Sequence, residues 1–269
     1  CTPPNRFGEV DPAILYAAKM CGITELYTLG GAQAIAAMAY GTETVPKVNK
    51  ILGPGNAWVT AAKQVVTEDP EGATVEFPAG PSELMVIADS YANSTLVAAD
   101  LLSQAEHDAN SHVMLCTTSM DFAQEVNEAL QLQLKDLPRK KIAEKALSNG
   151  KILIVRTLSE AVDIANNYAP EHLSLQCVDS LDWISQIRNA GAVFVGSNAA
   201  EAFGDYVTGS NHVLPTYGYA RSFSGLSVCD FLRFMSVQSM DDYAVHQLGN
   251  AAMTLADLEG LKGHSNAIK

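Results

Sequence analysis

The stretch VNKILGPGNAWVTAAKQVV, residues 48–66, decides the fold class. It runs from a short β-type block through the glycine-containing loop 53–56 into a helical pattern. The stretch before it, ITELYTLGGAQAIAAMAYG (residues 23–41), has the same order, with a glycine pair at 30–31 between a β-type block and a run of small residues. Two strand–glycine–helix units in succession predict an α/β layer with parallel strands.

The same alternation continues after a Gly/Pro-rich break, FPAGPSE, at residues 77–83. Helical patterns are expected from Ser94, over 120–149, from Ser159 and between 178 and 190, and they alternate with five predicted strands: LMVIAD (84–89), HVMLCTT (112–118), KILIV (151–155), LSLQC (173–177) and GAVFVG (191–196). We therefore expect a partial α/β domain at 1–81 and a second α/β domain at 82–226. Residues 227–269 have a helical pattern without strand signals, so this tail must pack on another surface of its own chain or of a partner.

Composition excludes several classes of function. Lys and Arg number 17 against 30 Asp and Glu, the net charge is −13 and no basic cluster is present, so a nucleic-acid partner is not expected. The apolar runs fall short of the roughly 20 residues that cross a bilayer, so no membrane partner is expected either. The five cysteines are odd in number and widely separated, which favours a reducing cytoplasm over a disulfide framework.

Gln104 and His107, in the segment LLSQAEHD (101–108), form the first candidate site. The segment belongs to an amphipathic helix for which Ser94 is the expected N-cap. Residues three apart on a helix can converge on one point, so an amide and an imidazole could supply half of a zinc site. The alternative is that both are buried polar residues of an ordinary helix.

Two later segments also carry chemically useful side chains. In NYAPEHLSL (167–175), Glu171 and His172 stand at the entrance to a predicted strand, where a histidine can act as a base near neutral pH and a glutamate can activate water. Adjacent residues in extended chain face opposite ways, so the two need not pair with each other. In FGDYVTGSNHVLPT (203–216), Asp205 and His212 could complete a metal or substrate site begun elsewhere. Solvated loops and turns would use the same residues without any function.

Taken together, these stretches resemble histidinol dehydrogenases over essentially the whole chain. The resemblance rests on TPP (2–4), LGGAQAIAAMAYGT (29–42), GPGNAWVTAAK (53–63), AGPSELMVIAD (79–89), ADLLSQAEHD (99–108), APEHL (169–173), GDYVTGSNHVLPT (204–216), ARSFSGLSV (220–228) and GHSNA (263–267). It implies a zinc-dependent, NAD-linked oxidation of L-histidinol to L-histidine through L-histidinal, with reduction of two NAD. It also implies two incomplete Rossmann-like domains with parallel sheets.

The resemblance assigns roles to individual residues. Carried over motif by motif, it implies one zinc ion per subunit held by Gln104, His107, Asp205 and His264. It implies His172 as the general base and Glu171 as the group that helps to activate water. The substrate would be held by the four zinc ligands, by His172, and by Ser82, His212 and Glu259. The NAD contacts would be Gln33 and Asn56, in the glycine-loop regions where helix N-termini also favour anions.

The family resemblance further implies a homodimer whose helical tail crosses to the partner, so that Glu259 and His264 complete the partner's site. Relative to the family, the sequence lacks the N-terminal portion that would supply the rest of an α/β domain, an arm at the dimer interface and a tyrosine used with NAD. Two other functions stay open. One is a related zinc- and NAD-dependent alcohol dehydrogenase for another small polyol, and the other is an inactive fragment that keeps the motifs.

Overall fold

The computed structural model describes residues 1–77 and 79–269, which form two compact units, Cys1–Val228 and Cys229–Lys269. Pro78, in the predicted break between the α/β domains, lies outside the described residues. The second unit begins two residues after the predicted start of the tail at 227. A division of the first unit near residue 81 stays a prediction.

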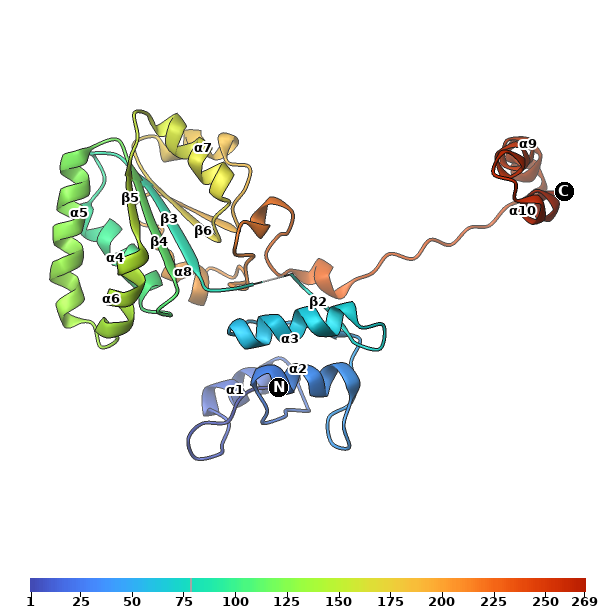
Figure 1. Cartoon of the computed structure of the whole chain (residues 1–269), viewed down its shortest axis with the longest axis horizontal. Helices are drawn as coiled ribbons and strands as arrows, with labels where there is room; N and C mark the ends of the chain where they lie inside the picture. Colours follow the sequence, from blue (N-terminus) through green and yellow to red (C-terminus); the bar gives the residue numbers. More distant parts are fainter. Residues whose placement is uncertain (78) are drawn as a thin grey trace. The chain divides into compact units, whose positions relative to one another are not determined.

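The first unit contains a five-stranded parallel sheet with helices packed on it (Figure 1). Its strand order is β5-β4-β3-β6-β7, and every neighbouring pair is parallel. The strands are β3 (Glu83–Ala88), β4 (His112–Thr117), β5 (Lys151–Ile154), β6 (His172–Gln176) and β7 (Ala192–Val195). The chain starts at the central strand, winds outward to one edge and then to the other, so the fold is doubly wound. The predicted α/β class with parallel strands is confirmed.

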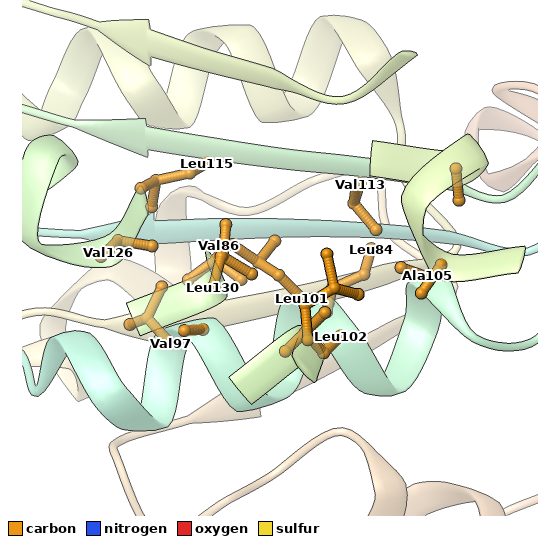
Figure 2. Packing of buried hydrophobic residues seen from close by; sticks show 14 of the residues in the cluster. Leu84, Val86, Val97, Leu101, Leu102, Ala105, Val113, Leu115, Val126 and Leu130 are labelled. Carbon is orange, nitrogen blue, oxygen red and sulfur yellow. The ribbon is translucent and has the colours of Figure 1, made fainter. Parts of the chain in front are cut away.

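Helices cover both faces of this sheet. On one face lie α4 (Ser94–Ala105), α5 (Met120–Gln133), η1 (Leu134–Asp136) and α6 (Lys140–Asn149). Figure 2 shows side chains of α4 and α5 packed against Leu84 and Val86 of β3, and residues of η1 and α6 belong to the same cluster. The opposite face of β3 presents Met85 and Ile87 to α7 (Leu158–Tyr168) and to the 3-10 segment η2 (Ser180–Gln186). Because both faces are covered, β3 is buried throughout, and all of its residues after Glu83 are apolar.

A smaller parallel sheet joins β1 (Lys50–Ile51) to β2 (Thr74–Val75). It packs with α2 (Gly31–Tyr40) and α3 (Ala57–Glu68) around Ile35, Ile51 and Val66, while α1 (Pro12–Met20) precedes them. The strand–glycine–helix order predicted for 48–66 is present, and the Asn56 side chain caps α3 by accepting the N–H groups of Trp58 and Val59.

The structure corrects four local predictions. The β-type block at 23–29 forms only the isolated bridge Thr2↔Thr28, because no neighbouring strand pairs with it further in the described chain. The predicted helix between 178 and 190 is the 3-10 segment η2, the form that short connectors often take. Asn93, not Ser94, caps α4, because its side chain accepts two N–H groups of the first turn. The fourth correction concerns the tail, which lacks regular structure over 232–241.

The second unit consists mainly of α9 (Asp242–Leu258) and α10 (Lys262–Ile268). The short turn η3 (Tyr219–Arg221) precedes it, and η4 (Val228–Phe231) spans its first residues. Within this unit only Gly249, Ala256 and Ser265 are buried, all of them small. It therefore has no hydrophobic core of its own. Among all described residues, no helix combines the length and apolar character needed to span a membrane.

Candidate active site

One polar cavity of about 240 Å³ lies at the amino ends of the central strands. Ser82 precedes β3 and His172 begins β6, while α4 runs back along the sheet so that its last residues reach the same edge. In many open α/β sheets, ligands bind instead outside the carboxyl ends of the strands. Seven of the predicted site residues line this cavity: Ser82, Gln104, His107, Glu171, His172, Asp205 and His212.

His172 is held with a defined ring orientation. Its Nδ1 lies 3.0 Å from the backbone oxygen of Glu83, the strand residue one position before its register partner Leu84. A carbonyl oxygen can only accept, so the neutral ring donates from Nδ1 and keeps a free lone pair on Nε2. Burial lowers the pKa of His172, which keeps the ring neutral near pH 7. Nε2 is therefore the atom that can accept a proton from a ligand.

Glu171 shares this environment. Its Oε2 accepts the backbone N–H of Glu83 at 2.8 Å and lies 3.5 Å from Nδ1 of His172, so the two adjacent residues do approach each other. Burial, with the nearby carboxylate of Glu83 as a further cause, raises the pKa of Glu171 to about 9. At neutral pH the carboxyl group is thus protonated, and a cation in the cavity would favour its ionised form.

The cavity also contains a donor set that suits a metal ion. The Gln104 side chain is fully buried, yet neither of its amide atoms has a hydrogen-bond partner among the described residues. His107, which lies in the turn just after α4 rather than on the helix, places Nε2 3.7 Å from Oδ2 of Asp205. A buried amide without a hydrogen-bond partner costs free energy, which a bound ligand would offset. Zinc binds imidazole nitrogen and carboxylate oxygen. The residues present therefore fit a zinc ion.

Glu201 is a cavity residue that the sequence did not predict. It precedes α8 (Ala202–Tyr206), its side chain is about 1% exposed, and its Oε2 accepts the hydroxyl of Ser103 at 3.0 Å. His172, Glu201 and Asp205 form a group whose potential ligand atoms all lie within 4.8 Å of one another. Burial, followed by the charge of Asp205, raises the pKa of Glu201 to about 7. The only sequence signal was an isolated acid among small residues in SNAAEAFG (197–204).

The remaining predicted residues lie elsewhere. Gln33 is exposed on α2, and Asn56 lines a neighbouring hollow of about 320 Å³ together with the glycine pair at 30–31. Because the oxygen of Asn56 caps α3, only its amide nitrogen is left for a cofactor. Glu259 is the C-cap that follows α9 and His264 lies in α10, both exposed in the second unit. The roles of these four residues stay predictions.

The chain is an α/β protein with a doubly wound sheet. Its cavity is lined by imidazole, amide and carboxylate groups that could bind a metal ion. The chain belongs to the histidinol dehydrogenase family, whose model, described as "Histidinol dehydrogenase", matches residues 1–269. It is 52% identical over 269 residues to the histidinol dehydrogenase of Legionella pneumophila (strain Philadelphia 1) and 51% identical over 267 residues to that of Pseudoalteromonas translucida. These matches cover 100% and 99% of this chain.

The chain spans 62% of the length of both relatives. The fold comparison agrees with the family: the crystal structure of histidinol dehydrogenase from Elizabethkingia anophelis superposes with a TM-score of 0.94 at 44% identity. That superposition covers 100% of this chain and 61% of the other. The resemblance inferred from the motifs is therefore confirmed at the level of the family and its fold.

Proposed function

We propose that the protein oxidises L-histidinol to L-histidine through L-histidinal with reduction of two NAD, in the last steps of histidine biosynthesis. The observation that carries the proposal is the convergence of Gln104, His107, Glu171, His172 and Asp205 on one cavity in a chain of this family. The volume of the cavity is smaller than the roughly 300 Å³ at which drug-sized pockets begin, so the cavity suits a small substrate.

The protein side chains divide the acid–base work. In each oxidation, Nε2 of His172 accepts the hydroxyl proton as the carbinol carbon loses hydride, for which bound NAD would be the acceptor. Water then adds to the aldehyde carbon to give a hydrate, which is oxidised in the same way to the carboxylic acid. Glu171, which touches the same wall of the cavity as His172, is the group that activates this water in its ionised form.

The cofactors are zinc, one per subunit, and NAD. Gln104, His107, Asp205 and His264 would hold the zinc ion, which supplies a positively charged template for the imidazole and amine nitrogens of histidinol. Ser82, His212 and Glu259 would hold the rest of the substrate. Gln33 and Asn56 would contact NAD, and the hollow beside the glycine pair at 30–31 supports a ligand at that position.

The proposed assembly is a cytoplasmic homodimer with shared active sites. The second unit buries only small residues and exposes Leu248, Leu255 and Leu258 of α9, so it needs another surface to cover them. His264 and Glu259 belong to this unit, which supports their predicted role in completing a site.

The test is to incubate the protein with zinc, NAD and L-histidinol and to follow the absorbance of NADH. Two NADH formed per histidinol support the proposed reaction. Turnover with another small polyol but not with histidinol would favour the related alcohol dehydrogenase instead. A folded, zinc-loaded dimer that forms no NADH with either substrate would favour the inactive fragment.

A further inference from the structure

We propose that Glu201 is a positioning residue for His172, whose carboxylate faces Nε2 and stabilises the ring after it has accepted a proton. The inference rests on the proposed function, because it assigns a partner to the base of that reaction. It concerns a residue that no motif singled out and that lies about thirty positions from His172 in the chain.

The first argument is the geometry around the imidazole. Nδ1 of His172 lies 3.0 Å from the backbone oxygen of Glu83, and Nε2 lies 3.7 Å from Oε1 of Glu201. Nδ1 therefore faces a carbonyl oxygen, which can only accept a hydrogen bond. Nε2 faces a carboxyl oxygen, which also can only accept when Glu201 is ionised. A neutral imidazole has a single N–H and can satisfy one of them, whereas the imidazolium has two and can satisfy both. The pocket is thus complementary to the protonated ring, which forms only during the reaction.

The second argument is that Glu201 is fixed in place while one of its oxygens is left free. Oε2 lies 3.0 Å from the Ser103 hydroxyl, whose single hydrogen it shares with the backbone oxygen of Asp100 at 2.8 Å, so the carboxyl group contacts α4. Oε1 is buried and has no hydrogen-bond partner among the described residues. A buried carboxyl oxygen without a partner costs free energy. Because this oxygen lies on the cavity wall beside His172, the cost is explained if it serves a transient N–H of the ring.

The nearest alternative role for Glu201 is as a metal ligand, since it also lies close to Asp205. The buried amide of Gln104 has no hydrogen-bond partner among the described residues, so Gln104 can serve as the metal ligand in place of Glu201. With Gln104, His107 and Asp205 as ligands, Glu201 is free to act on His172. The two roles predict different results when the charge of Glu201 is removed while its size is kept.

The test is Glu201→Gln in the metal-loaded protein, with Ser103→Ala as the matched variant. Glu201→Gln keeps the volume of the side chain and can still accept from Ser103. Its zinc content and its Kd for L-histidinol should therefore stay within about twofold of wild type, and its unfolding midpoint should be unchanged. Its kcat should fall roughly 100-fold. Ser103→Ala, which loosens the carboxylate but keeps its charge, should lower kcat less. Loss of zinc from Glu201→Gln, or an unchanged kcat, would overturn the proposal.

A readout independent of turnover separates this proposal from the proposed function. In ¹⁵N-labelled metal-loaded protein at a single pH, Glu201→Gln should shift the ring nitrogen resonances of His172 and leave those of His246, an exposed residue of α9, unchanged. If histidinol is not oxidised but His172 still shifts, the proposed reaction is wrong and the positioning contact stands. If His172 does not shift, the contact is refuted whatever the protein oxidises.

Discussion

Glu83 and Glu171 each accept the backbone N–H of the other: Glu171 Oε2 lies 2.8 Å from the nitrogen of Glu83, and Glu83 Oε2 lies 3.4 Å from the nitrogen of Glu171. The two carboxyl groups nevertheless differ in their surroundings. The second oxygen of Glu83 accepts the backbone N–H of Tyr217 at 3.0 Å, so both of its oxygens are used by the protein. Glu171, in contrast, lines the cavity.

This difference predicts opposite effects for the two matched amide substitutions. Glu83→Gln should lower the free energy of unfolding by about 1–3 kcal/mol, because a buried N–H group would meet an amide NH₂ instead of an acceptor. Glu171→Gln can still accept from Glu83 and should unfold like wild type while losing NADH formation. Urea unfolding and the rate of NADH formation measure the two effects. Equal stability losses in both variants would contradict the division of roles.

Gln104→Leu tests the amide that has no partner. Leucine removes the buried nitrogen and oxygen and nearly keeps the volume, so without metal the variant should be at least as stable as wild type, by up to about 1–3 kcal/mol. Its zinc content after dialysis should fall strongly. His172→Asn is the control, since it removes the base but no predicted ligand, and it should retain zinc while turnover is abolished. Zinc loss in His172→Asn with retention in Gln104→Leu would place the ion beside His172 and Glu201 instead.

The sequence predicted those parts of the fold that depend on local pattern. The apolar run at 84–88 identified β3, because a strand covered on both faces needs apolar residues at every position. The block at 23–29, which mixes apolar and polar residues, was also predicted as β-type but forms only one bridge in the described chain. Strand formation depends on a neighbour, which local pattern cannot supply.

The site was predictable only in part for the same reason. Gln104 and His172 lie in recognisable sequence motifs. The family resemblance placed them in one site, which their spacing in the sequence alone could not predict. Glu201 stands in no motif, and its carboxyl group contacts Ser103, 98 positions away. Such a contact follows from the return of the chain after β7 to the amino edge of the sheet. Nothing in the local sequence around Glu201 encodes that return.

Lys63→Met should destabilise the loop that precedes α3. Lys63 is buried, its Nζ lies 2.6 Å from Oε1 of Glu76, and the same oxygen accepts the N–H of Gly53 at 2.9 Å. Removing the lysine leaves a buried carboxylate unpaired, which costs about 3–5 kcal/mol. Lys47→Met, which breaks a pair with exposed Glu71, should cost less than about 1 kcal/mol. Urea unfolding compares them, and similar losses would argue against a structural role for the buried pair.

Asp100→Asn should flatten the pH dependence of stability. Burial raises the pKa of Asp100 from 3.8 to about 6, with Gln176 donating to its Oδ2 at 2.7 Å. Because the folded state holds this proton more tightly, the contribution is fully present below pH 3.8 and is lost as pH rises through about 6. Wild type should therefore lose about 2 kcal/mol more than the variant between those limits. Parallel stability curves for Asp100→Asn and wild type would refute the prediction.

The predicted crossing of the tail can be tested by mixing two inactive variants. His172→Asn removes the base in the first unit and His264→Asn removes a predicted ligand in the second, so each homodimer should be inactive. If sites are shared, a mixed dimer contains one site with both substitutions and one site with neither.

Random mixing after reversible unfolding should then restore roughly a quarter of the wild-type rate, since half of the dimers are mixed and each has one intact site of two. Mixing His172→Asn with Gln104→Leu, whose substitutions both lie in the first unit, is the control and should restore nothing. This follows because every site then carries one defect or the other. Activity that returns in the control as well would show subunit contamination, and no activity in the first mixture would show that the tail completes the site of its own chain.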